Sequence, residues 1–199
     1  MAGDYLVLQD ITDSFLEPNI MDIKIGAKTY GPDASESKMA QEDAKYVGTK
    51  MPFGYSVTGL IVHSLSDDGI VRKFDKNFGK NLKSEDVLSI PEVFFDLKNR
   101  FVPDLLELII DQITNIYNVC NEQRKYKMFA SSVLLAYDAA AVRKFVRNEI
   151  DRTELSRWTI VRIIDFAHVF DAKHERDDNF LTGLENLTTL FKSCLNNRK

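Results

Sequence analysis

The segment from Pro18 to Gly31 constrains the fold of this chain more than any other stretch. Asp22 and Lys24 stand two residues apart among isoleucines, which favour a β-strand. Side chains two positions apart project from the same face of a strand, so an acidic and a basic group would point into one place. Gly26 then lets the chain turn away. On this pattern alone, a surface ion pair on an edge strand is the simpler interpretation.

Further strands are expected where the sequence is apolar and rich in β-formers. A short run at 5–8 and the partly alternating run FGYSVTGLIVH at 53–63 are two of them. Apolar runs within 127–137 and 159–166 are joined by a charged connection with helical turns, which favours an antiparallel pair. The predicted sheet holds the strands that carry Asp22, Ser131 and Asp165.

Two amphipathic helices are expected to pack on this sheet. Residues 103–121 open with Pro103 in the first turn, and Asp104 suits the positive end of a helix. Apolar residues recur at helical spacing there and again over 180–195. At 199 residues the chain has the length of a single domain, 1–199. The predicted fold class is α+β, an antiparallel sheet with packed helices.

A third helix is expected to begin at Asp33, which has capping-box spacing to Glu36. Ala40, Ala44 and Val47 would form its apolar stripe. The opposite side carries polar residues at positions i, i+3, i+4 and i+7: Lys38, Gln41, Glu42 and Lys45. Such a face is either solvated, with an ordinary Lys–Glu pair, or turned toward a polyanion. Periodicity leaves both interpretations open.

The composition limits the partners of this chain. A formal net charge of −4 gives no general affinity for nucleic acid, so an anion site must be a local cluster of cations. One such cluster is 72–83, where Phe74 and Phe78 interrupt basic residues, a pattern typical of single-stranded nucleic acid or of a small anion. We expect the small anion, because the segment is short. No apolar run is long enough for a membrane span, and Cys120 and Cys194 fit a reduced, cytoplasmic or nuclear protein.

Asp165 ends an apolar strand, where a carboxylate is either a strand-end cap or a ligand for a hard cation. Its context, Ile-Asp-Phe-Ala-His, and the Pro-x-x-x-Asp-x-Lys-x-Gly pattern that starts at Pro18 resemble elements of the inositol polyphosphate kinase family. Ser-Ser-Val-Leu from Ser131, Ser-x-x-Lys from Ser35 and Asp-x-Phe-x-x-Gly-Leu from Asp178 are similar to further elements of that family. The hexakisphosphate kinase and multikinase branches are the most similar.

The resemblance implies a role for each matching position. Adenine would meet backbone groups of a hinge over 5–12, at Gln9, Asp10 and Ile11, and the ribose would meet Asp22. Acceptor phosphates would be held by Lys24, Lys38, Gln41, Lys45 and Lys80, with His168 beside them. Asp165 would bind Mg²⁺ and would form the catalytic set with Lys24 and His168. The implied activity is transfer of the γ-phosphoryl group of ATP to an inositol polyphosphate, by a monomer that binds neither nucleic acid nor membrane.

Family members carry an N-terminal lobe before the hinge, with a phosphate-binding loop and lysine. Only residues 1–4 precede the hinge-like segment here, so we expect the hinge and the C-terminal lobe alone. Three interpretations follow: a reduced but active kinase, a fragment of an active kinase, or a module that binds inositol polyphosphates without turnover. Which inositol phosphate is the acceptor is not readable from the sequence.

Overall fold

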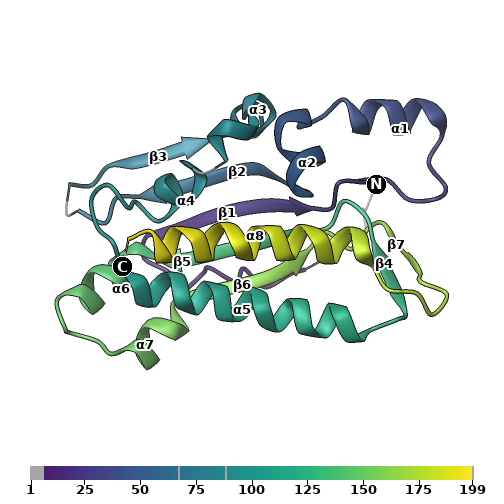
Figure 1. Ribbon diagram of the computed structural model, residues 1–199. Helices are drawn as coiled ribbons and strands as arrows, with labels where there is room; N and C mark the ends of the chain where they lie inside the picture. The colour runs from purple at the N-terminus through teal and green to yellow at the C-terminus, as the bar shows by residue number, and fades with distance from the viewer. Residues whose placement is uncertain (1–6, 67, 88, 199) are drawn as a thin grey trace, which may run out of the picture.

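The computed structural model describes residues 7–66, 68–87 and 89–198. Its centre is a five-stranded sheet in the order β3-β2-β1-β5-β6, in which every neighbouring pair is antiparallel (Figure 1). The strands are β1 (Pro18–Ile25), β2 (Tyr55–His63), β3 (Val71–Phe74), β5 (Ser132–Asp138) and β6 (Thr159–Ile164). A separate two-stranded sheet pairs β4 (Tyr126–Met128) with β7 (Val169–Asp171). The expected α+β class with an antiparallel sheet is confirmed.

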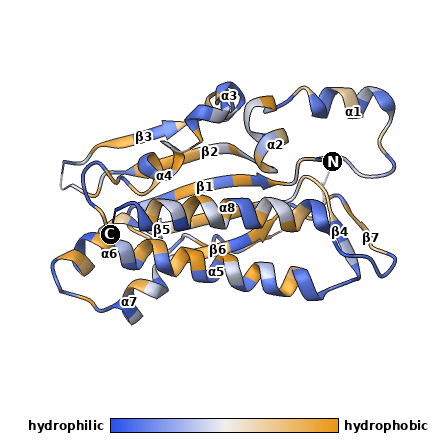
Figure 2. Ribbon diagram, in the orientation of Figure 1, coloured by the Kyte–Doolittle hydropathy of each residue, from blue (hydrophilic) through white to orange (hydrophobic). Residues whose placement is uncertain are grey.

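The two long helices lie side by side across one face of the large sheet (Figure 1). They are α5 (Pro103–Glu122) and α8 (Asp178–Asn196), which confirms both amphipathic helices, and Figure 2 shows apolar and polar stretches alternating along them. The shorter helices are α1 (Glu36–Asp43), α2 (Val47–Phe53), α3 (Lys76–Asn81), α4 (Ser89–Phe94), α6 (Ala139–Val146) and α7 (Arg152–Arg157), with a 3₁₀ turn at Ser84–Asp86. Helices α6 and α7 are the helical turns expected between β5 and β6.

Strand β1 shows how the sheet divides core from site. Met21, Ile23 and Ile25 are fully buried, while the alternate residues are only half-buried, as the two-residue period of a strand requires. The buried set joins the core that α5 and α8 complete, where Ile109 and Leu184 are also fully buried. The alternate residues, Ile20, Asp22 and Lys24, therefore lie on the sheet face opposite α5 and α8, which we call the open face.

The helix expected from Asp33 is shorter and differently capped. It begins at Glu36, and the Ser35 side chain, rather than Asp33, accepts the capping hydrogen bond, from the backbone N–H of Lys38 at 3.2 Å. Tyr46, in the left-handed region at φ 55°, separates α1 from α2. Consequently the predicted apolar stripe is wrong: Ala40 and Ala44 are exposed, and α1 has no buried residue.

The strand expected at 5–8 is also not found in the described part of that segment, residues 7 and 8. Residues 5 and 6 lie outside the described part of the chain, and Val7 and Leu8 are outside any strand, with exposed fractions of 91% and 76%. They gain no partner strand, so an apolar run alone was insufficient evidence. Among the helices of the described ranges, none combines the length and apolarity needed to cross a membrane.

Candidate active site

A cavity of about 340 Å³ opens where the C-terminal end of β1 meets α1, α2, α3 and the residue after β6. Five lysines are among its lining residues: Lys24, Lys45, Lys50, Lys76 and Lys80. Three carboxylates accompany them: Asp22, Glu42 and Asp165. We call this the lysine cavity. A protein of net charge −4 thus gathers cations at one place, which is the local cluster that an anion site requires.

Strand register brings the chemically active groups together. Lys24 pairs with Ser132 on β5, and Ser132 in turn pairs with Ile164 on β6, so Asp165 follows at the same edge of the sheet. Within the described residues, no ion pair is found for the side chain of Lys24. The acidic and basic groups expected at β1 therefore face the lysine cavity, and the interpretation as a simple surface ion pair on an edge strand is wrong, because β1 is central in the sheet.

Asp165 is held in an uncommon backbone conformation. Its φ is +65°, in the left-handed region that aspartate enters more readily than most residues. The hydroxyl of the fully buried Ser131 donates to its backbone oxygen at 2.8 Å. This bond fixes the turn after β6, while the carboxylate itself remains exposed beside the cavity.

Three polar side-chain atoms near this edge are buried without a hydrogen-bond partner among the described residues. They are Asp22 Oδ1, Ser132 Oγ and Oγ of Ser56, which pairs with Lys24 on the β2 side. Leaving such an atom unsatisfied costs about 1–3 kcal/mol, so atoms of this kind indicate a place where a ligand, cation or water completes the structure. The backbone oxygen of Asp22 is satisfied by the Thr58 hydroxyl at 3.2 Å, beside a β-bulge that interrupts the β1–β2 register.

Glu42 neutralises part of the cationic charge. Its carboxylate lies 3.0 Å from Lys38 Nζ and 2.8 Å from Lys45 Nζ. Partial burial acts to raise the pKa of Glu42, but hydrogen bonds from Lys45 and Lys38 outweigh it and lower the pKa to about 2. Glu42 is therefore ionised at any physiological pH, and both lysines already have a partner.

Lys50 is a lining residue that sequence reasoning missed. Its exposed fraction is 1%, and its ammonium donates to the backbone oxygen of Glu42. Burial lowers its pKa from the ordinary value of 10.5. No periodic or motif signal distinguishes this lysine, which lies in a short helix interrupted by Pro52. Lys76 was likewise passed over, although its segment was recognised as basic.

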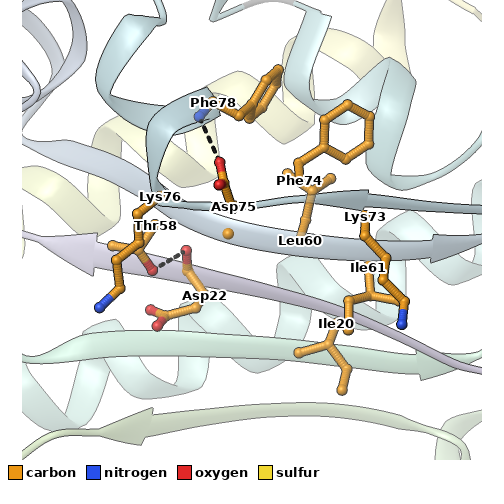
Figure 3. Close-up of a pocket in the computed structure, with 11 residues that line it drawn as sticks. Ile20, Asp22, Thr58, Leu60, Ile61, Lys73, Phe74, Asp75, Lys76 and Phe78 are labelled. Carbon is orange, nitrogen blue, oxygen red and sulfur yellow. Dashed lines mark hydrogen bonds between the residues drawn. The ribbon is translucent and has the colours of Figure 1, made fainter.

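A second hollow of about 640 Å³ lies beside the lysine cavity on the open face. Ile20, Leu60, Phe74 and other apolar residues line it together with a few charged ones, and Figure 3 shows these three to one side of Asp22 and Thr58. Asp22 and Thr58 line both hollows, so the apolar and cationic spaces share a border. An apolar surface next to a cation-rich cavity can receive a ligand with an aromatic end and a charged end.

Other predicted site residues lie away from both hollows. Lys38 and Gln41 are exposed on α1, and the Gln41 amide contacts Ser37 Oγ at 3.4 Å. His168 is exposed after β6, and its backbone oxygen accepts a hydrogen bond from Phe129 N–H at 3.0 Å. The expected hinge residues lie outside both linings as well: Gln9, Asp10 and Ile11. Their implied roles stay predictions.

Metal binding here would depend on more than protein ligands. Throughout the described ranges, no group of three or more His, Cys, Asp or Glu side chains is arranged to hold a metal ion. Mg²⁺ commonly uses one or two carboxylates together with substrate phosphates. Asp165 and the unpartnered Asp22 Oδ1 fit that mode.

Comparisons with known proteins identify the family of this chain. A model of the inositol polyphosphate kinase family matches residues 5–192. Inositol hexakisphosphate kinase 3 of Mus musculus is 27% identical over 200 residues, which cover 94% of this chain and 50% of the relative. The inositol polyphosphate multikinase of Homo sapiens is 31% identical over 137 residues, covering 69% and 32%. This chain thus spans half, or less, of the length of these two relatives.

A solved structure confirms the fold. The crystal structure of an inositol phosphate multikinase from S. cerevisiae, in complex with ADP and Mn²⁺, superposes with a TM-score of 0.77 at 23% identity. The match covers 94% of this chain and 82% of that one. The antiparallel sheet carries a lysine-lined cavity at its strand ends, an arrangement whose charge is complementary to that of an anion. With the family match over nearly its whole length, the chain belongs to the inositol polyphosphate kinase family.

Proposed function

We propose that this chain supplies the acceptor and metal sites of an ATP-dependent kinase that phosphorylates an inositol polyphosphate. The observation that carries the proposal is the register Lys24–Ser132–Ile164, which brings a lysine and Asp165 to one edge of the sheet beside further lysines. Phosphoryl transfer asks a protein mainly to position two anions and to neutralise their charge. The lysine cavity offers both.

The nucleotide would lie on the open face. Asp22, between the two hollows, would accept hydrogen bonds from the ribose, while half-buried Ile20 and Leu134 on either side of it offer an apolar floor for the base. Backbone groups of Gln9 to Ile11 would contact the adenine edge, as the family resemblance implies. The neighbouring structure with ADP supports nucleotide binding in this fold.

Mg²⁺ would be held by Asp165 and the nucleotide phosphates, and when bound it would neutralise charge that develops on the transferred group. Lys24, at the same edge, would contact phosphates of both nucleotide and acceptor. Lys45 and Lys80 line the cavity and would bind acceptor phosphates. The remaining predicted acceptor contacts come from residues outside the cavity lining: Lys38, Gln41 and His168.

The proposed protein is a monomer of the cytoplasm or nucleus without affinity for nucleic acid. Its acidic composition supports the last point, because non-specific nucleic-acid binding depends on basic surfaces. The competing function is binding of inositol polyphosphates without turnover, by a protein of the same fold.

One experiment separates these two functions. The protein is incubated with ATP, Mg²⁺ and a series of inositol polyphosphates, and phosphoryl transfer is measured together with ligand binding by calorimetry. Transfer that disappears in Asp165→Asn, with ligand affinity retained, supports the kinase. Binding without transfer supports the binding module. Folded protein that shows neither activity would sink both proposals.

A further inference from the structure

Glu42 is the one carboxylate among the described lining residues of the lysine cavity to which the proposed reaction assigns no role. Its side chain is 14% exposed, whereas those of Lys38 and Lys45 are 52% and 42% exposed. Both ammonium groups bond its Oε1, and the Thr29 hydroxyl donates to its Oε2 at 3.3 Å. Glu42 is therefore the inner member of this cluster, and the two lysines lie outside it.

The backbone of Glu42 is fixed as well. Lys50, itself buried, donates its ammonium hydrogen to the Glu42 backbone oxygen, close to the end of α1. Side chain and backbone are thus held by donors from different parts of the chain: Thr29 before α1, Lys38 within it, and Lys45 and Lys50 after it. A carboxylate held in this way is a fixed part of the cavity wall.

This geometry sets what a ligand can place at the Lys45 end of the cavity. A phosphate that reaches Lys45 must approach Glu42, because a carboxylate oxygen already lies 2.8 Å from Lys45 Nζ. The two anions then compete for the same donors and repel each other where water is partly excluded. A ligand hydroxyl, in contrast, can donate a hydrogen bond to a carboxylate, which only accepts.

We propose that Glu42 determines acceptor specificity, by selecting inositol polyphosphates that present a hydroxyl rather than a phosphate at the Lys45 end of the lysine cavity. The inference rests on the proposed function. The ligand class it names is an incompletely phosphorylated inositol, and the fully phosphorylated ring is disfavoured because every position then carries a phosphate.

The test compares inositol hexakisphosphate with inositol tetrakisphosphate by calorimetry in wild type, Glu42→Gln and Glu36→Gln. Glu36 is an exposed glutamate on the same helix and provides the matched loss of charge. In Glu42→Gln, the ratio of affinities should move toward the hexakisphosphate by about tenfold, equivalent to roughly 1.4 kcal/mol. Glu36→Gln should keep the wild-type ratio. If Glu42→Gln does not fold, Glu42→Ser removes the same charge.

The possible outcomes separate a failure of this inference from a failure of the proposed function on which it rests. An unchanged ratio in Glu42→Gln, in a protein whose binding is weakened by Lys24→Ala, overturns the inference and leaves the site in place. An equal shift in Glu36→Gln also overturns it, because the effect is then one of net charge. If neither the wild type nor any of the variants binds either ligand, the proposed function and the inference fail together.

Discussion

Ser131 and Asp165 are joined by a hydrogen bond from the serine hydroxyl to the aspartate backbone oxygen at 2.8 Å. The bond supports a residue at φ +65°, a conformation that persists only when its surroundings stabilise it. Because Ser131 immediately precedes β5 and Asp165 immediately follows β6, the bond links the adjacent ends of two paired strands. The position of the candidate metal ligand thus depends on a side chain that need not touch any ligand.

Ser131→Ala should reduce phosphoryl transfer more than it reduces stability. Loss of one such hydrogen bond costs about 1 kcal/mol of unfolding free energy, whereas a displaced carboxylate affects the reaction directly. Inositol polyphosphate affinity should change little, since the lysines stay in place. Transfer rates, thermal unfolding and calorimetry measure these three quantities. Ser89→Ala, which removes an exposed serine bond to the Asp86 backbone oxygen outside the cavity lining, is the control.

Ile109→Asp should unfold or strongly destabilise the protein. Ile109 is fully buried on α5, within the core shared with α8. A buried, unpaired carboxylate costs several kcal/mol, a large part of the roughly 5–15 kcal/mol that stabilises a domain. Thermal or urea unfolding measures the loss. Asn115→Asp, on the exposed side of the same helix, should leave the midpoint almost unchanged. Equal stability of both variants would show that α5 is not core.

Lys50→Met should change how stability depends on pH. Burial lowers the pKa of Lys50 below its ordinary 10.5, so between the two values the unfolded chain binds more protons than the folded one. The Lys50 contribution to the unfolding free energy therefore rises with pH up to about 10.5 and is lost as pH falls through the lowered pKa.

The methionine variant lacks this contribution. Its unfolding free energy, taken relative to wild type, should decline as the pH rises from neutral toward 10.5. Urea unfolding of both proteins across that range provides the measurement, and the difference cancels other groups that titrate there. Parallel curves would mean that Lys50 is protonated as readily in the folded protein as in the unfolded chain.

The sequence was sufficient to predict those helices and strands whose local signals agree with one another. Residues 103–121 combine a proline, an acidic first turn and a helical apolar period, and α5 forms at Pro103–Glu122. Helix α1 shows the opposite case. Its alanines suggested a buried stripe, but Tyr46 adopts a left-handed conformation and no core forms beneath the helix. Neither tertiary effect is visible in a local pattern.

The residues of the candidate site likewise fall into those that were predicted from the sequence and those that were missed. The site roles of Asp22, Lys24 and Asp165 were predicted from the family resemblance, and strand register brings these residues to one edge of the sheet. Lys50 was missed, since its role follows from burial against Glu42, a contact that only the turn at Tyr46 creates. Strand pairing is readable from sequence to this extent, whereas the packing of short helices around a cavity is not.

The last prediction concerns which lysine binds the acceptor most strongly. Lys24 lines the cavity without an ion-pair partner in the described ranges, whereas Lys38 lies outside the lining and is already bonded to Glu42. A free lysine can give its full charge-assisted contact, worth roughly 1.5–3 kcal/mol, so Lys24→Ala should weaken binding of an inositol polyphosphate about ten- to a hundredfold.

Lys38→Ala should weaken the same binding less, because Lys38 is exposed outside the cavity lining and its charge is already engaged by Glu42. Calorimetry with inositol tetrakisphosphate at low and high salt measures both effects, and the loss in Lys24→Ala should shrink at high salt through screening. Lys98→Ala, at an exposed position outside the cavity lining, controls for the change in net charge. A larger loss in Lys38→Ala than in Lys24→Ala would place the acceptor on the outer face of α1 and move the binding site out of the cavity.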